Sequence, residues 1–142
     1  MNILVSSCLL GIPARYNGEE IVNNDALALL QKHTLVPVCP EQLGGLPIPR
    51  EPAEIHSSRV MTRSGKDVTD AYQKGAEATL AIARMFGCTH AIFQKRSPSC
   101  GCGKIYDGMF HRKMVDGNGV SAQRLIDAGI IVMDESEAKA LL

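Results

Sequence analysis

Three cysteines, Cys8, Cys39 and Cys100, each follow a short apolar run that predicts a β-strand. The carboxyl ends of parallel strands open onto one edge of a sheet, and ligands bind in that crevice. We therefore expect three thiols that are far apart in sequence to meet at one edge. Thiolates of this kind suit a zinc ion or an iron–sulfur cluster. A cluster held by three cysteines leaves one metal open to substrate, which is the condition for Lewis-acid chemistry.

Cys100 lies in residues 95–103, which read Lys-Arg-Ser-Pro-Ser-Cys-Gly-Cys-Gly. Proline and glycine allow such a loop to turn closely around a small group. Of the two serines that flank the proline, Ser97 and Ser99, we expect one to brace the loop and the other to face the pocket. The sequence leaves Cys102 open as a fourth ligand, a spare thiol or core filler, whereas Cys88 is expected in the core.

Glu41 stands two residues beyond Cys39 and is expected at the same edge. Partial loss of water and a neighbouring anionic cluster would favour its protonated form and suit it to acid/base chemistry. The cationic residues of these loops balance thiolate charge or grip an anionic substrate group, unless they form ordinary surface ion pairs. They are Arg15, Arg50, Lys95 and Arg96. The four histidines show no metal-ligand spacing and are interpreted as structural.

Composition limits the possible partners. Lys+Arg 15 against Asp+Glu 15 gives a formal net charge of +0, and Trp 0 leaves few stacking platforms, so a nucleic acid polymer is not expected as a partner. No apolar stretch is long enough to span a bilayer, so no membrane partner is expected either. The odd number of cysteines, Cys 5, and the lack of an export signal indicate a reducing, cytoplasmic location. The oligomeric state is left open.

The elements that position these residues alternate between strand and helix. Strands are expected over residues 2–6, 35–38, 89–94 and 130–133, and helices over residues 25–32, 69–86, 121–128 and from 134 onward. Hairpins are expected within residues 53–66, turning at Ser64-Gly65, and within residues 105–110, turning at Asp107-Gly108. This order predicts one α/β domain over residues 1–142. Its architecture is an open, Rossmann-like three-layer sandwich with a mainly parallel sheet of about four strands. A loop and hairpin cover is expected at the carboxyl edge of the strands.

A set of motifs in order resembles the domain of unknown function 523 family, whose characterised members are thiouracil desulfurases. The motifs cover nearly the whole chain: residues 8–11 and 15–18, Pro-Val-Cys-Pro-Glu at 37–41 with 44–46 and 49–50, residues 65–69, Ser-Pro-Ser-Cys-Gly at 97–101, and Tyr-Asp-Gly at 106–108.

The resemblance implies a 4Fe-4S cluster held by Cys8, Cys39 and Cys100, with a fourth iron free to take the sulfur of a thiocarbonyl. The implied reaction is a non-redox hydrolysis of a C=S group in a small thiolated heterocycle such as a thiouracil. Glu41 matches an acid/base position and Ser97 a position that assists at the pocket. An exposed cluster is prone to oxidative loss, so aerobic preparations are expected to lack it.

Three alternatives remain at this stage. A sulfur transferase would use the same cluster and pass sulfide to another acceptor. A cluster- or zinc-binding structural or sensing module would saturate its metal, with Cys102 as fourth ligand, and turn nothing over. Plain cysteine nucleophile catalysis is the weakest, because no histidine is placed by sequence beside any cysteine.

Overall fold

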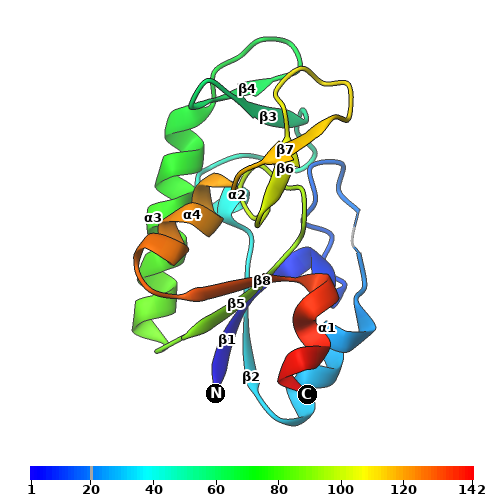
Figure 1. The fold of residues 1–142 in the computed structure, drawn as a ribbon, viewed down its shortest axis with the longest axis vertical. Coiled ribbons are helices and arrows are strands. Elements are labelled where there is room, and N and C mark those ends of the chain that lie inside the picture. Colours follow the sequence, from blue (N-terminus) through cyan, green and yellow to red (C-terminus); the bar gives the residue numbers. More distant parts are fainter. Residues whose placement is uncertain (20) are drawn as a thin grey trace.

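A parallel sheet forms the centre of the computed structural model, which describes residues 1–19 and 21–142 (Figure 1). Within this part of the chain, four strands lie in the order β2-β1-β5-β8, and every neighbouring pair is parallel. The strands are β1 (Asn2–Ser6), β2 (Thr34–Val38), β5 (His90–Phe93) and β8 (Ile131–Asp134). The predicted α/β architecture is confirmed.

Helices cover both faces of this sheet because its strands alternate their apolar side chains between the two faces. On β1, Leu4 packs on one side with Leu80 of α3 (Thr69–Met85) and Leu125 of α4 (Val120–Asp127). The neighbouring Ile3 faces the opposite side, where Leu9 is also buried.

The second face is covered by short helices. They are η1 (Ser7–Leu10), α1 (Asn24–Ala28), η2 (Leu29–Gln31) and η3 (Glu135–Leu141), and three of them are 3₁₀ helices. The Asn23 side chain caps α1 by accepting from the N–H of Ala26 at 2.9 Å, as expected of a helix start here. Asp134 and Glu137 form a capping box at the start of η3, where a helix was expected from residue 134 onward. No helix in the described residues is both long and apolar enough to cross a membrane.

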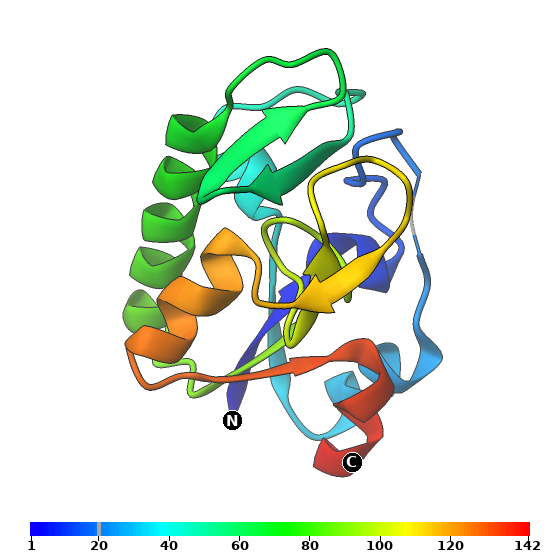
Figure 2. The ribbon, with the colours of Figure 1, turned by 45° about the horizontal axis from the view of Figure 1, so that its top comes forward.

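Two antiparallel hairpins lie beyond the carboxyl edge of the sheet (Figure 2). The first joins β3 (Ala53–His56) to β4 (Arg59–Thr62), and the second joins β6 (Lys104–Tyr106) to β7 (Met114–Asp116). β3 lies beside β6, so the hairpins form one continuous cover. A cover at this edge was predicted.

The turns of both hairpins were predicted at the wrong residues. The first hairpin turns at Ser57-Ser58, both at positive φ (50° and 65°), because such a turn matches the twist of the paired strands. Ser64 and Gly65 instead form a later turn, in which the N–H of Gly65 donates to Thr62 O at 2.9 Å. That turn leads from β4 toward α3.

In the second hairpin, Asp107-Gly108 opens a long connection, residues 107–113, instead of forming the tip. Gly108 packs so closely on β3 that a Cβ would lie 2.6 Å from Ile55 O. The contact with β3 therefore decides the path of this connection.

Candidate active site

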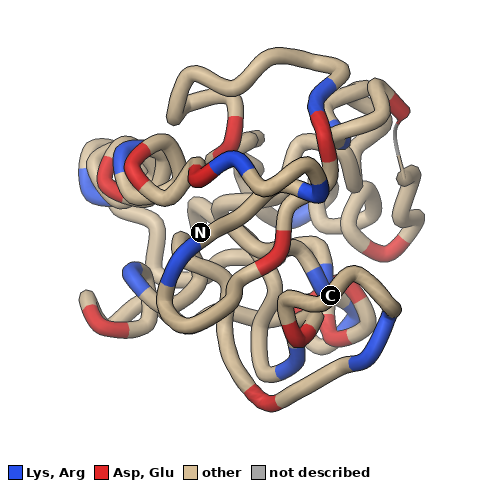
Figure 3. The backbone as a smooth tube through the Cα atoms, turned by 90° about the horizontal axis from the view of Figure 1, so that it is seen from above, with Lys and Arg blue, Asp and Glu red and all other residues tan. Residues whose placement is uncertain are grey.

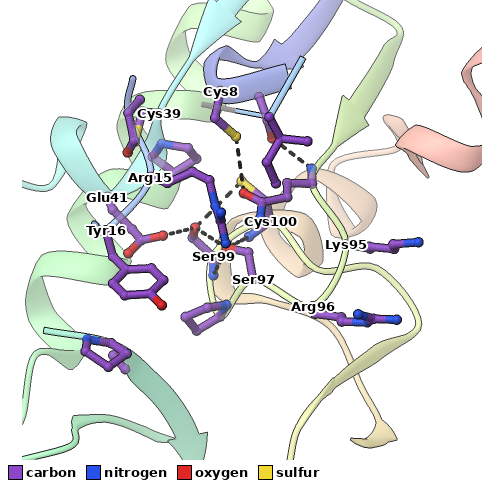
Figure 4. Close-up of a pocket in the computed structure, with 18 of the residues that line it drawn as sticks. Cys8, Arg15, Tyr16, Cys39, Glu41, Lys95, Arg96, Ser97, Ser99 and Cys100 are labelled. Carbon is purple, nitrogen blue, oxygen red and sulfur yellow. Dashed lines mark hydrogen bonds between the residues drawn. The ribbon is translucent and has the colours of Figure 1, made fainter. Parts of the chain in front are cut away.

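A cavity of about 440 Å³ opens at the carboxyl edge of the sheet, and Cys8, Cys39 and Cys100 all line it (Figure 4). Cys8 lies in η1 after β1, Cys39 follows β2, and Cys100 lies in the loop after β5. The structure thus brings the three predicted ligands together. Glu41 and Ser97 line the same cavity.

Cys8 and Cys39 each use their thiol to donate to an oxygen of a different segment. Cys8 Sγ donates to Gln94 Oε1 at 3.2 Å, and Cys39 Sγ donates to Ala14 O at 3.6 Å. Burial, with the Cys39 thiol nearby, raises the pKa of Cys8 to about 11. The thiol is therefore protonated at neutral pH, and a metal that bound it would have to displace this proton.

The loop that carries Cys100 is braced from within by Ser97. Its Oγ accepts the N–H groups of Ser99 at 3.2 Å and Cys100 at 3.1 Å, and its carbonyl accepts the N–H of Gly101 at 2.7 Å. Burial raises the pKa of the Cys100 thiol well above its usual range, while hydrogen bonds involving Ser6 and Ser99 oppose that effect. Ser97 is thus the serine that braces the loop.

The N-terminus of α4 holds the same loop from outside. The N–H groups of Ser121 and Ala122 donate to Ser99 O at 2.9 and 3.0 Å. Gly119 permits this approach, because a Cβ there would lie 2.5 Å from the carbonyl carbon of Ser99. Helix α4 was predicted to begin with Ser121 as its cap. Its N-cap is instead Gly119, two residues earlier, and its first helical residue is Val120.

Glu41 lies in the first turn of α2 (Pro40–Leu43), directly after Cys39. Its Oε1 accepts from Arg50 Nε at 3.1 Å and from the Tyr72 hydroxyl at 2.7 Å, and its Oε2 accepts from Ser99 Oγ at 2.9 Å. The Glu41 side chain is 14% exposed and that of Arg50 is 6% exposed. Burial and the nearby Glu41 raise the pKa of Tyr72, so its hydroxyl remains a donor. A carboxylate is therefore held in one orientation at the cavity wall.

Ser99 connects this carboxylate to the proposed cluster ligands. Its Oγ lies 3.6 Å from Cys100 Sγ and 3.0 Å from Ser97 Oγ, and the residue is 1% exposed. Sequence reasoning left open which serine faces the pocket and did not find the contact of Tyr72 with Glu41. Tyr72 is spaced along α3 like the apolar residues that face the core. Its hydroxyl group is the only feature in the sequence that could have marked it as a site residue.

Helix α2 is held against α3 through a pair of glycines. A Cβ on Gly44 would lie 2.0 Å from Ala71 O, and a Cβ on Gly75 would lie 2.0 Å from Pro40 O. The two helix backbones are therefore in direct contact. This contact sets the position of Glu41 relative to Tyr72.

Positive charge exceeds negative charge around the cavity, although both signs are spread over the whole chain (Figure 3). Among the described residues that line it, six are Lys or Arg and three are Glu. The cations are Arg15, Arg50, Arg63, Lys95, Arg96 and Arg112, and the carboxylates are Glu41, Glu54 and Glu135. A surplus of positive charge favours anionic groups in the cavity, including thiols that lose their protons.

Cys102 does not line this cavity. Its Sγ donates to the carbonyl oxygen of Val132 in β8 at 3.6 Å. Cys88 is buried in the sheet core, as expected. The arrangement thus separates Cys102 from the three thiols at the strand ends.

The donor set fits an iron–sulfur cluster by its chemistry. Clusters are held by cysteine thiolates, and all five cysteines of the chain are free thiols. Cys8, Cys39 and Cys100 line one cavity, yet no three His, Cys, Asp or Glu side chains in residues 1–19 and 21–142 converge as ligands of a single metal ion. Three thiols from three strand ends around one cavity are the type of donor that such a cluster requires.

A parallel α/β sheet with three thiols and a braced carboxylate around one cavity at its carboxyl edge defines an α/β protein with a thiol-lined binding site. The chain belongs to the 2-thiouracil desulfurase family, whose model matches residues 3–137. An uncharacterised Bacillus subtilis (strain 168) protein, YbbK, is 43% identical over 150 residues, with 99% of each chain covered. A solved structure described as 4Fe-4S-dependent thiouracil desulfidase TudS (DUF523Vcz) has a TM-score of 0.92 and 42% identity, and the match covers 99% of this chain and 94% of that one. The resemblance noted from the motifs is confirmed.

Proposed function

We propose that residues 1–142 form one catalytic domain that removes sulfur from a small thiolated heterocycle such as a thiouracil. In this proposal a 4Fe-4S cluster is held by Cys8, Cys39 and Cys100. The family membership and the described cofactor of the solved relative support both the reaction and the cluster. The observation that carries the proposal is the shared cavity, where three thiols from three strand ends face a braced carboxylate.

The reaction exchanges sulfur for oxygen without electron transfer. Water adds to the thiocarbonyl carbon, the C=S bond becomes C=O, and hydrogen sulfide leaves. When bound, the cluster supplies a Lewis-acidic iron, which polarises the C=S bond. Cys8, Cys39 and Cys100 would hold the cluster, and Cys102 would not serve as a fourth ligand, because its Sγ donates to the Val132 carbonyl at 3.6 Å.

The protein's own residues move the protons. Arg50 and Tyr72 both donate hydrogen bonds to Oε1 of Glu41. Its Oε2 accepts a hydrogen bond from Ser99, which lies beside the Cys100 thiol. Glu41 Oε2 is thus positioned to take a proton from the attacking water and to return it to departing sulfide. Ser97 contributes indirectly by bracing the loop and by its contact with the Ser99 hydroxyl.

Anaerobic reconstitution with iron and sulfide tests the proposal. Iron and sulfide analysis and EPR spectra report the cluster, and sulfide release from thiouracil reports the reaction. Glu41→Gln is expected to retain the cluster and to lose about 10²- to 10⁴-fold in rate, the usual contribution of an acid/base group. Full activity in this variant contradicts the assigned role.

Gln42→Ala is the matched control for Glu41→Gln, because Gln42 is the exposed neighbour on α2. It is expected to keep the wild-type rate and cluster content. Wild-type protein that forms no cluster, or a cluster lost on Cys102→Ser, contradicts the proposed ligand set. Transfer of sulfur to an acceptor, without free sulfide, identifies a sulfur transferase instead.

The partner in this proposal is a small molecule and not a nucleic acid polymer or a membrane. A cavity of about 440 Å³ suits a compound of that size. We place the reaction in the cytoplasm, where thiols such as the five free cysteines stay reduced.

A further inference from the structure

The connection between β6 and β7, residues 107–113, contributes Phe110 and Arg112 to the lining of the cavity. We infer that Phe110 stacks on the flat ring of the substrate, and that Glu54 of β3 is a positioning residue that holds Phe110 there. This inference rests on the proposed function, because it assigns the recognition of the heterocycle that carries the sulfur.

Aromatic side chains are concentrated at the cavity. The sequence has Tyr 3 and Phe 3, and Tyr16, Tyr106 and Phe110, half of this set, line the cavity. Phe110 offers an aromatic surface with no hydroxyl group, which suits the face of a heterocycle. It is also half-buried, so part of its ring is already fixed by protein.

Glu54 fixes the backbone at Phe110. It is 8% exposed, and its Oε1 accepts the N–H groups of Gly108 and Phe110, both at 3.1 Å. Hydrogen bonds from N–H groups to a carboxylate are among the stronger ones in proteins. Gly108 also lies directly on β3, where a Cβ would come within 2.6 Å of His56 Cβ. The connection therefore has little freedom to lift away from β3.

Arg63, which follows β4, holds the Phe110 ring itself. Its guanidinium carbon lies 5.6 Å from the centroid of that ring, within cation–π range. The β3–β4 hairpin thus contacts Phe110 twice, through Glu54 at the backbone and through Arg63 at the ring. Such a ring is preorganised, so a bound heterocycle does not have to order it.

Uracil is the probe for this recognition, because it has the ring but no thiocarbonyl and undergoes no desulfuration. Its dissociation constant is measured by calorimetry on cluster-loaded protein. Phe110→Ala is expected to raise that constant about 5- to 150-fold, the usual loss of one aromatic stacking partner. Phe110→Tyr, which keeps the ring, is expected to stay within about twofold of wild type, as is the control Met109→Ala. Met109 is the adjacent residue, 61% exposed and outside the cavity lining.

A double-mutant cycle distinguishes a role of Glu54 in positioning Phe110 from a general effect of Glu54 on protein stability. Glu54→Ala is expected to weaken uracil binding, and Glu54→Gln, whose amide oxygen still accepts both N–H groups, is expected to restore most of it. If Glu54 acts through Phe110, Glu54→Ala combined with Phe110→Ala binds uracil no more weakly than Phe110→Ala alone. Additive losses in the double variant overturn the positioning role.

Sulfide release from the flat thiouracil and from the acyclic compound thiourea gives a second measurement. Phe110→Ala is expected to raise KM for thiouracil with little change in kcat and to leave thiourea unaffected. Equal losses on both substrates overturn the inference, as does unchanged uracil affinity in Phe110→Ala or absent uracil binding by wild type. Wild type that binds uracil through Phe110 but releases no sulfide refutes the proposed function and leaves the ring recognition standing.

Discussion

The contact between α2 and α3 gives a sharp mutational prediction, Gly75→Ala. The new Cβ would lie 2.0 Å from the carbonyl oxygen of Pro40, whereas ordinary contacts begin at 3.4 Å. The obstacle is backbone, which cannot rotate aside as a side chain can. The helices must therefore part by about 1.4 Å, the difference between these two distances.

Two opposing effects determine how much Gly75→Ala changes the free energy of unfolding. Overpacking of a tight contact costs about 1–3 kcal/mol, and replacing a helical glycine by alanine recovers about 0.5–1 kcal/mol. The net loss in the free energy of unfolding is about 0–2.5 kcal/mol, which lowers Tm by up to roughly 8 °C for a chain of this size. Because α2 carries Glu41, its displacement also lowers turnover, by as much as about 10²-fold for a shift of this order.

Thermal unfolding by circular dichroism and sulfide release from thiouracil measure the two effects in the same Gly75→Ala protein. Gln73→Ala is the control, since it adds a good helix former at an exposed position of the same helix. Its Tm and rate should equal or exceed those of wild type. A Gly75→Ala protein with the Tm and the rate of this control would refute the reasoning.

Three further outcomes are expected. Hydrogen bonds from Thr69 lower the pKa of Asp67 to about 2, so the stability they confer is complete above its ordinary pKa of 3.8 and is lost as pH falls toward 2. Asp67→Asn should therefore lower Tm at neutral pH, with a difference that narrows in acid; a pH-independent difference in melting curves would contradict this. Cys102→Ser should keep wild-type iron content and turnover, and loss of either would show that its thiol serves the cluster. Gly119→Ala, whose Cβ would lie 2.5 Å from Ser99, should lower iron content after reconstitution, and unchanged iron would contradict the role of this contact.

Elements set by local signals were predicted well from the sequence. Residues 2–6 form β1 as expected, because a run of apolar residues is bounded at once by polar Ser6 and Ser7. Asn23 and the Asp134–Glu137 pair cap their helices through side-chain hydrogen bonds that local spacing reveals. The strand ends, and with them the meeting of the cysteines, follow from these boundaries.

Elements set by distant contacts were predicted less well. The Asp107-Gly108 pair has the composition of a hairpin tip, yet Glu54 and the surface of β3 draw it into a longer connection. Likewise, the acid/base candidate Glu41 was found from its place after Cys39, but its contacts with Tyr72 and Ser99 span 31 and 58 residues of sequence. The periodicity and local spacing of residues in the sequence do not reveal contacts between side chains so far apart.

The three proposed ligands have a consequence for how the protein matures. Cys8, Cys39 and Cys100 belong to loops that meet because β1 pairs with both β2 and β5. A zinc ribbon can chelate from a short peptide, since its ligands are neighbours in sequence. Here a nascent chain lacks the complete site until β5 has left the ribosome and joined the sheet. With this ligand set, cofactor insertion would therefore follow the pairing of β5 with β1.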